Sequence, residues 1–226
     1  MSHLTHADFA AAVFVKTPGR SPIKTRLARE LGTPLALDFY NRACEVMREV
    51  LESMGPGWKP YWAVAEAEPI DHRWHSWSTV LQGEGELGQR LHHVYATLLK
   101  HHRAVVLLGA DAPQITSHLL REAIARVRRG TFVLGPARDG GFYLFAGATP
   151  LPASVWTQVQ YSQATTREEL AAQLRPWGTI ETLDELRDVD EALDFQALAD
   201  LEASEDSGYL SCQIDMISWC HSLRKP

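Results

Sequence analysis

The sequence predicts an α/β domain built on a mostly parallel, doubly wound sheet. Two continuous apolar runs, residues 10–15 and 104–109, are typical of central strands that are covered on both faces. Segments with helical spacing of apolar residues alternate with these and shorter apolar runs, which indicates crossover helices between parallel strands. A chain of 226 residues suits one such domain and can bury a large core without disulfides.

The predicted elements follow in order along the chain. Strand 10–15 runs into a segment of proline, glycine and basic residues that continues neither a strand nor a helix. A helix that begins near residues 33–34 carries apolar residues at helical spacing and stops at residues 55–57. Further strands are expected at 61–65, 79–82, 104–109, 131–134, 142–145 and 179–183, and further helices at 87–101, 115–127, 165–174 and from 190 onward.

The bulk properties restrict the class of protein. We expect a single catalytic domain over residues 1–203 and a weakly patterned C-terminal tail, 204–226, whose role the sequence does not assign. The formal charge of −6 argues against nucleic acid as a partner. Three cysteines without metal spacing, and the lack of a signal-peptide or membrane-spanning pattern, predict a cytoplasmic protein with no membrane partner. The sequence leaves a homodimer open.

A basic segment follows the first predicted strand, in a chain that is acidic as a whole. Ligands of doubly wound sheets bind at the carboxyl ends of strands, so these cations are expected to neutralise the phosphates of a nucleotide. The segment is not a Walker loop, because the Gly-Lys-Ser/Thr ending is missing. A solvated basic loop is the alternative interpretation. The cations are Lys16, Arg20, Lys24, Arg26 and Arg29.

Asp111 follows the second apolar run directly, in Gly109-Ala110-Asp111-Ala112-Pro113. A carboxylate at this point can hold Mg²⁺ (or Mn²⁺), which prefers one or two carboxylates together with substrate phosphates. An ordinary turn or N-cap aspartate is the alternative. Thr116 is the better N-cap for the next helix, which favours a catalytic and metal-binding role for Asp111.

Two later segments add polar groups at strand ends. Asp139-Gly140-Gly141 allows close approach of a ligand to the backbone, and Asp139 could contact a sugar hydroxyl or act as a base. A plain hairpin turn explains the same residues. Asp188 and Asp190 could complete a metal site with Asp111, although an acidic helix N-terminus is a common arrangement.

Residues 83–88 match the dinucleotide-binding pattern G-x-G-x-x-G, which raises the hypothesis of a nicotinamide-dependent oxidoreductase. The pattern places Glu84 and Glu86 beside the pyrophosphate, and the strand before it is weak and not the first of the sheet. We therefore favour a loop that directs Arg90 toward the substrate.

Five motifs occur in an order that resembles a bacterial family of GT-A-type glycosyltransferases in the nucleotide-diphospho-sugar transferase superfamily. They are also similar to the phospholactate guanylyltransferases and the molybdenum-cofactor nucleotidyltransferases. The motifs are residues 14–18 with 24–27, residues 82–90, residues 109–113, residues 135–144 and residues 188–190.

The resemblance implies a three-layer, Rossmann-like GT-A fold with a mostly parallel mixed sheet. It implies that Asp111 is the metal-binding aspartate after the central strand, that Asp188 and Asp190 help to bind magnesium, and that Lys24 and Arg26 lie in the nucleotide-phosphate loop. This chain lacks the paired glycines of that loop, so side-chain cations are expected to hold the phosphates. The D-x-D motif of typical glycosyltransferases is also missing at the central strand.

The leading hypothesis is a metal-dependent transferase that acts on a small-molecule nucleotide and an unidentified acceptor. The family resemblance favours a nucleotide-sugar glycosyltransferase, whereas the basic first loop favours nucleotidyl transfer from a nucleoside triphosphate. The predicted phosphate-binding set is Lys16, Arg20, Lys24, Arg26, Arg90, Gly140 and Gly141. A non-catalytic nucleotide-sensing or partner-binding module is the alternative of another class.

Overall fold

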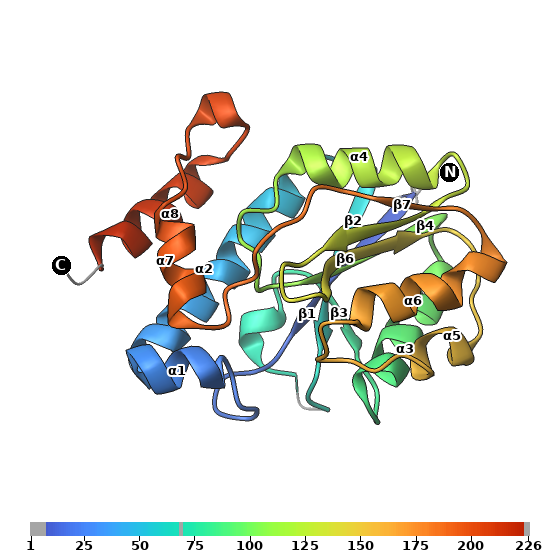
Figure 1. Cartoon of the computed structure of the whole chain (residues 1–226), viewed down its shortest axis with the longest axis horizontal. Coiled ribbons are helices and arrows are strands. Elements are labelled where there is room, and N and C mark those ends of the chain that lie inside the picture. The colour runs from blue at the N-terminus through green and yellow to red at the C-terminus, as the bar shows by residue number, and fades with distance from the viewer. Residues whose placement is uncertain (1–7, 68–69, 224–226) are drawn as a thin grey trace, which may run out of the picture.

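The computed structural model describes residues 8–67 and 70–223 (Figure 1). Its strands form a seven-stranded sheet in the order β3-β2-β1-β4-β6-β5-β7. Neighbours in the sheet are parallel, except that β6 is antiparallel to both β4 and β5. The mostly parallel mixed sheet predicted from the sequence is therefore confirmed. The strands are β1 (Phe9–Val15), β2 (Trp58–Val64), β3 (Ser78–Leu81), β4 (Ala104–Gly109), β5 (Phe132–Pro136), β6 (Phe142–Gly147) and β7 (Ile180–Thr182).

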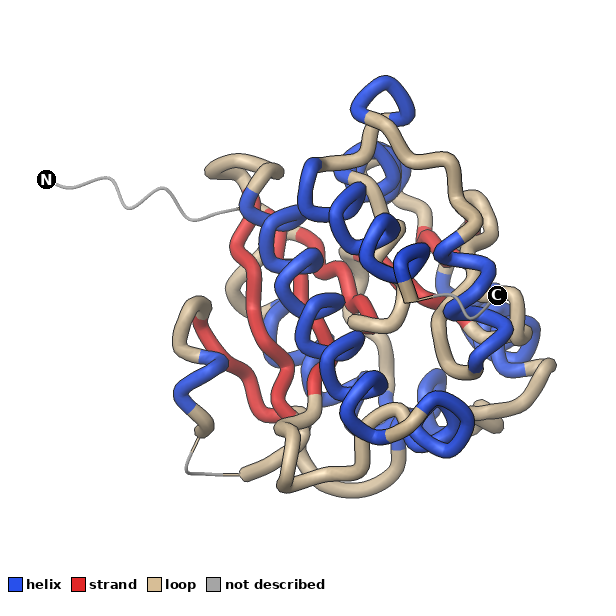
Figure 2. Tube along the Cα trace, turned by 90° about the vertical axis from the view of Figure 1, so that its left-hand side faces the viewer, coloured by secondary structure: helices blue, strands red, loops and turns tan. Residues whose placement is uncertain are grey.

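Helices cover both faces of the sheet, which gives three layers (Figures 1 and 2). One face packs against α2 (Thr33–Glu52) and α4 (Ser117–Val127), while α8 (Ser211–Ser222) packs on α2 and on α7 (Ala192–Ala199) and extends the same apolar core. The other face packs against α3 (Leu87–Leu99), α5 (Ala153–Thr157) and α6 (Thr166–Leu174). The short helix α1 (Thr25–Leu31) packs against α2 and α7.

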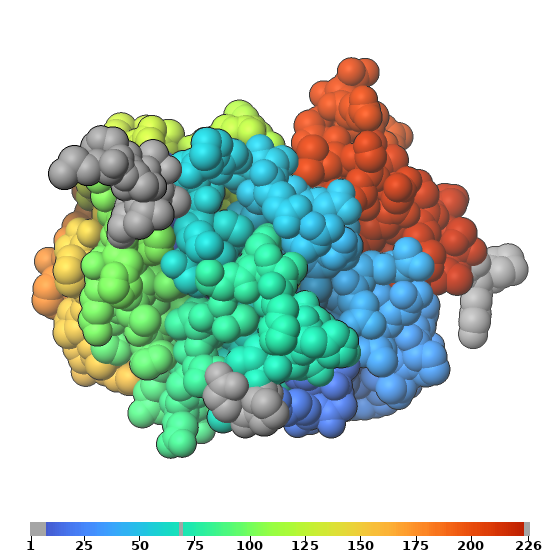
Figure 3. All heavy atoms as spheres, turned by 180° about the vertical axis from the view of Figure 1, so that it is seen from behind, coloured from blue at the N-terminus to red at the C-terminus, as the bar shows by residue number. Residues whose placement is uncertain are grey.

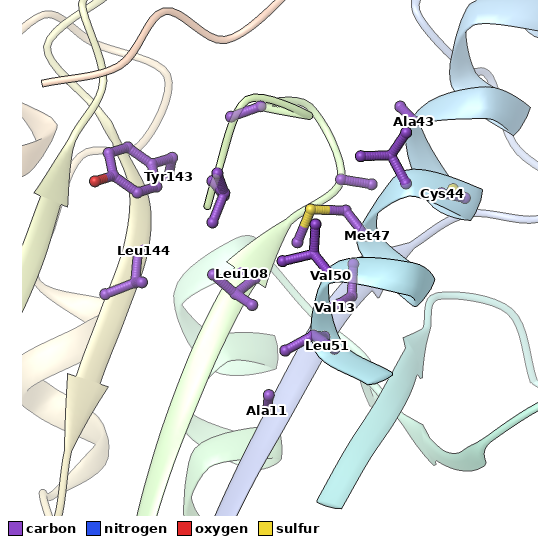
Figure 4. Close-up of a cluster of buried hydrophobic side chains, with 14 of the residues drawn as sticks. Ala11, Val13, Ala43, Cys44, Met47, Val50, Leu51, Leu108, Tyr143 and Leu144 are labelled. Atoms are coloured by element: carbon purple, nitrogen blue, oxygen red, sulfur yellow. The ribbon is translucent and has the colours of Figure 1, made fainter. Parts of the chain in front are cut away.

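The core follows from the alternation of side chains along the central strands. In Figure 4, Ala11 and Val13 of β1 and Leu108 of β4 lie on the face of the sheet that meets Met47 and Val50 of α2. The intervening residues of β1 and β4 point to the opposite face and pack under α3 and α5. Both faces are covered, so these strands are apolar throughout, and this is the pattern that the sequence shows.

The order of the strands creates a switch point between β1 and β4. The chain leaves β1 through α1 and α2 toward β2, then passes from β3 through α3 to β4 on the other side of β1. The loops that follow Val15 and Gly109 therefore leave neighbouring parallel strands at the same edge of the sheet. A crevice outside the strand ends at such a switch point is where open α/β sheets bind ligands.

Helices α1, α5 and α8 have no counterpart in the sequence prediction. Helix α1 has no side-chain cap and no acidic residue in its first turn, so its start carries no local signal. Helix α8 lies in the tail, where Gln213, Met216, Ile217 and Cys220 point into the core between α2 and α7. Figure 3 shows the residues from about 200 to 223 as a raised lobe at one end of the molecule.

No helix within the described ranges, 8–67 and 70–223, is long and apolar enough to cross a membrane.

Candidate active site

A cavity of about 630 Å³ opens at the switch point. Its floor is formed by the ends of β1 and β4, and its walls by α1, α3, the β5–β6 loop and the segment before α7. Small-molecule sites in proteins usually measure roughly 300–1,000 Å³, so the cavity is large enough for a nucleotide. The sequence predicted a ligand at this edge, and the structure has a cavity there.

Lys24 joins two of the predicted metal ligands at the cavity wall. Its Nζ lies 2.6 Å from Oδ1 of Asp111 and 2.8 Å from Oδ1 of Asp190. The Lys24 side chain is only 4% exposed, whereas Asp111 and Asp190 are 45% and 43% exposed. Burial alone lowers the pKa of Lys24, but the two carboxylates more than reverse this effect and raise it above its usual value. Lys24 is therefore held as a cation.

Asp188 lies in the same wall and carries uncompensated charge. Burial, together with repulsion from Asp139, Asp190 and Asp111, raises the pKa of Asp188 to about 6. Four carboxylates thus line one cavity, and the ammonium of Lys24 pairs with two of them. Such a cluster attracts a further cation.

Replacing Asp188 with asparagine is expected to stabilise the metal-free protein near pH 7.5. A carboxyl whose folded pKa is about 6, against an ordinary value of 3.8, binds its proton more tightly in the folded state. Its contribution to stability is therefore full below about pH 4, falls between pH 4 and 6, and is lost above pH 6. The shift in the pKa of Asp188 corresponds to about 3 kcal/mol of unfolding free energy before solvent screening. Because Asp188 is partly exposed, we expect the substitution to stabilise the protein by about 1 kcal/mol.

Urea denaturation with EDTA at pH 4 and pH 7.5 measures this gain. The stabilisation should appear at pH 7.5 and vanish at pH 4. Asp184→Asn, which removes a carboxylate from an exposed part of the same segment outside the cavity, is the control. A gain of equal size at both pH values would contradict the charge repulsion at Asp188.

The predicted cations divide into two groups. Lys16 and Arg26 line the cavity together with Lys24. Arg20 lies outside the lining and donates through Nη2 to the carbonyl oxygen of Ala67 at 2.9 Å. Arg90 is also outside it and donates through Nε to the carbonyl oxygen of Gly85 at 2.8 Å.

The β5–β6 loop contributes Asp139 and Gly141 to the cavity. Oδ1 of Asp139 accepts a hydrogen bond from the backbone N–H of Gly141 at 2.7 Å, which fixes the turn. Gly140 faces away from the cavity lining, toward Ala164, and its carbonyl oxygen accepts from the backbone N–H of Arg167 at 3.0 Å. These residues therefore form a hairpin turn that also borders the cavity, and a role in ligand binding stays a prediction.

Three polar side chains that the sequence analysis did not single out hold the start of the β1 loop. The Tyr40 hydroxyl bonds the backbone N–H and carbonyl of Lys16, each at 2.8 Å. Thr17 is fully buried, and its hydroxyl accepts from Nε1 of Trp74 at 2.9 Å. The amide of Gln82 donates to the carbonyls at the ends of β1 and β2. Gln82 is the first residue of the motif at residues 82–90, and its place in that motif is the sequence signal that could have indicated its role.

The loop that carries Asp111 is supported from two sides. The backbone carbonyl of Asp111 accepts from the N–H of Val189 at 2.9 Å, which ties it to the Asp188–Asp190 segment. On the other side, Nε2 of buried Gln213 donates to the carbonyls of Pro113 and Ile115, at 2.7 and 2.9 Å. Helix α8 therefore packs directly beneath the loop of Asp111, and nothing local in the sequence predicts this contact.

The glycines of residues 83–88 pack against protein atoms. A Cβ at Gly85 would lie 2.1 Å from Oε1 of Gln89, whose side chain bonds the backbone N–H of Glu86. A Cβ at Gly88 would lie 2.4 Å from the carbonyl oxygen of Trp156. These spaces do not open to a pyrophosphate, which disfavours the dinucleotide-binding hypothesis.

The donor set agrees in chemistry with a hard divalent cation. Asp111, Asp188 and Asp190 present carboxylate oxygens to one cavity, and the raised pKa of Asp188 reports charge that a cation would neutralise. Across the described part of the chain, however, no three His, Cys, Asp or Glu side chains are already arranged around a metal position. A metal ion at this wall needs ligands from the substrate and a shift of Lys24.

The fold is of the nucleotide-diphospho-sugar transferase type. A protein from Desulfovibrio desulfuricans G20, provisionally described as a nucleotide-diphospho-sugar transferase, superposes with a TM-score of 0.82 at 20% identity, over 95% of this chain and 98% of that one. A nucleotidyl transferase from Methanothermobacter thermautotroptrophicus gives a TM-score of 0.52 at 12% identity, over 84% and 95% of the two chains. The 4-diphosphocytidyl-2C-methyl-D-erythritol synthase from Anaerococcus prevotii gives 0.50 at 10% identity, over 82% and 94%.

The sequence match is to a family of bacterial proteins. Residues 57–163 match the model of DUF2064, described as an uncharacterized protein conserved in bacteria. No curated protein matches the chain. The fold implied by the five motifs is thus confirmed.

Proposed function

We propose that this protein is a metal-dependent transferase that uses a nucleotide-sugar as its donor. The observation that carries the proposal is the switch-point cavity, which is lined by the cations Lys16, Lys24 and Arg26 and by the carboxylates Asp111, Asp188 and Asp190. Cations neutralise a diphosphate, and carboxylates bind the metal ion that accompanies it. Fold likeness to transferases of this type supports the same class.

The number of cations favours a diphosphate over a triphosphate. Of the five predicted phosphate-binding cations, Arg20 and Arg90 donate to backbone carbonyls outside the cavity lining. Lys16, Lys24 and Arg26 line the cavity, which is fewer cations than the sequence predicted and favours the smaller charge of the diphosphate in a nucleotide-sugar.

Magnesium, or manganese, would be held by Asp111 with help from Asp188 and Asp190, and when bound it would stabilise negative charge on the leaving diphosphate. Lys16 and Arg26 would neutralise the remaining phosphate oxygens. Asp139 would orient the acceptor hydroxyl or accept its proton. A hollow of about 320 Å³, lined by charged residues that include Asp139, Arg138 and Arg187, adjoins the carboxylates and would admit a polar acceptor.

Nucleotidyl transfer from a nucleoside triphosphate is the second candidate. One of the structures with the same fold is described as a nucleotidyl transferase, and the carboxylates would bind the same metal ion in either reaction. The two candidates differ in the donor, so a binding experiment separates them.

A thermal-shift panel with Mg²⁺ or Mn²⁺ tests the proposal. At a concentration of roughly 100 times Kd, a ligand adds about 2.7 kcal/mol of stability, which should raise Tm by on the order of 5–10 °C. Stabilisation by UDP- or GDP-sugars, and not by nucleoside triphosphates, is the expected result. The reverse preference would favour nucleotidyl transfer. Binding without turnover of any acceptor would favour the non-catalytic module, and no metal-dependent shift with either class would refute the proposal.

A further inference from the structure

Lys24 occupies the space between two of the carboxylates that the proposed function assigns to the metal ion. Its Nζ is within 2.8 Å of an oxygen of both Asp111 and Asp190, so one ammonium bridges them. The bridging group is almost fully buried, although both carboxylates are nearly half exposed. All three residues line the cavity, and Lys24 is the most buried of them.

A metal ion and the Lys24 ammonium compete for the same oxygens. Magnesium binds carboxylate oxygens at about 2.0–2.1 Å, and at that distance it would repel an ammonium that contacts the same Oδ1 of Asp111. The metal ion can thus enter only if Lys24 moves away or the repulsion is relieved. Negatively charged phosphate groups in the cavity supply both a new partner for the ammonium and compensating charge.

The backbone at Lys24 is unusual and bears on its role. The backbone of Lys24 has φ 44° and ψ 47°, which lie in the left-handed region that residues other than glycine rarely adopt. It stands at the N-cap of α1, where a side-chain oxygen acceptor is normally favoured, and it makes no capping hydrogen bond. This backbone conformation lowers local stability, but it places the Lys24 ammonium next to Asp111 and Asp190.

We propose, on the basis of the proposed function, that Lys24 is an internal counter-ion that holds the metal-binding carboxylates in the empty protein and transfers to a donor phosphate when metal and nucleotide bind together. Metal alone then binds weakly, because it must displace Lys24 without offering it a partner. The nucleotide provides that partner, so metal and nucleotide each strengthen the binding of the other. The Lys24 counter-ion therefore favours binding of the metal ion together with the nucleotide over binding of the metal ion alone.

The experiment measures Mn²⁺ binding by electron paramagnetic resonance, first with Mn²⁺ alone. Lys24→Met removes the competitor and is expected to bind Mn²⁺ at least about fivefold more tightly than the wild type, at the lower end of typical coupling between sites. Arg29→Met is the matched control, because Arg29 is exposed and lies outside the cavity lining, so that its replacement removes one positive charge from the helix that Lys24 caps without touching the site. Its Mn²⁺ affinity should change by less than about twofold, as expected for a screened surface charge.

The second arm repeats the titration in excess GDP or UDP. In the wild type, the nucleotide should increase Mn²⁺ affinity, and in Lys24→Met this enhancement should be reduced. Equal Mn²⁺ affinity of wild type and Lys24→Met, or an equal gain in Arg29→Met, would overturn the inference while leaving the proposed function intact. If no variant binds Mn²⁺ in the presence of any nucleotide, the proposed function itself has failed.

Folding of the variant is checked by circular dichroism before the titration. Should the methionine variant not fold, Lys24→Gln replaces it, because the glutamine amide still donates hydrogen bonds to the carboxylates but carries no charge. The same increase in Mn²⁺ affinity is expected for it, and its absence would count against the inference in the same way.

Discussion

Replacing Asp111 with asparagine is expected to abolish metal-dependent nucleotide binding without unfolding the protein. The change removes a charged oxygen at the point where the proposed metal ion meets the end of β4. Loss of groups that merely support metal ligands costs roughly 10–100-fold in affinity, so loss of a ligand itself should cost at least 100-fold. The fold should persist, because Asp111 is 45% exposed and the bond that it accepts from Val189 is made by its backbone carbonyl.

The measurement is nucleotide affinity with Mg²⁺ and with EDTA, by calorimetry. In the wild type, EDTA should weaken binding strongly, and in Asp111→Asn the two conditions should give the same weak affinity. Asp184→Asn serves as the control, since it removes an equal charge from a nearby segment outside the cavity. Unchanged, metal-sensitive binding in Asp111→Asn would rule out the metal-binding role.

Replacing Gly140 with alanine is expected to produce the largest loss of stability among surface-accessible positions near the site, about 2–4 kcal/mol. Gly140 has φ +90°, which strains any residue with a Cβ. In addition, that Cβ would lie 2.0 Å from the carbonyl oxygen of Ala164, so the segment before α6 would have to move. Tyr161 and Thr166, which flank that segment, line the cavity, and the displacement should therefore also weaken ligand binding.

Gly130→Ala separates the two causes. Gly130 has a similar φ of +86°, but no atom lies within 4 Å of the position that its Cβ would take. Its substitution should cost only the backbone strain, about 1 kcal/mol, and should leave nucleotide binding unchanged. Equilibrium denaturation in guanidinium chloride compares the variants. Equal losses of stability for Gly130→Ala and Gly140→Ala would show that the contact with Ala164 carries no energetic weight.

The sheet was predictable because its central strands are encoded locally. Strands β1 and β4 are buried on both faces, so each appears as an unbroken apolar run, and Asp111 stands at the point where one run ends. Helices α2 and α4 were predictable for the same kind of reason, since each buries one face at regular spacing. Thr116, which the sequence suggested as the N-cap of α4, does accept from the backbone N–H of Leu119.

Other elements lacked such a signal. Helix α1 is short and has no side-chain cap, so its basic residues were predicted to lie in a loop. Helix α8 buries a polar Gln213 at a core position, and this polarity blurs the apolar spacing that would otherwise identify the helix. Gln213 is satisfied by the carbonyls of Pro113 and Ile115, about a hundred residues away in the chain, and no local pattern can predict a partner at that distance.

The order of residues was enough to predict the fold class, the edge of the sheet at which the cavity opens, and the charged residues available there, because strand burial and strand ends are properties of short segments. The tertiary structure decided which charges meet. It pairs Lys24 with Asp111 and Asp190, and it directs Arg20 and Arg90 to backbone carbonyls. Side chains as long as lysine and arginine reach partners set by the packing of distant elements, and Coulomb energy depends on those distances, which the order of residues does not contain.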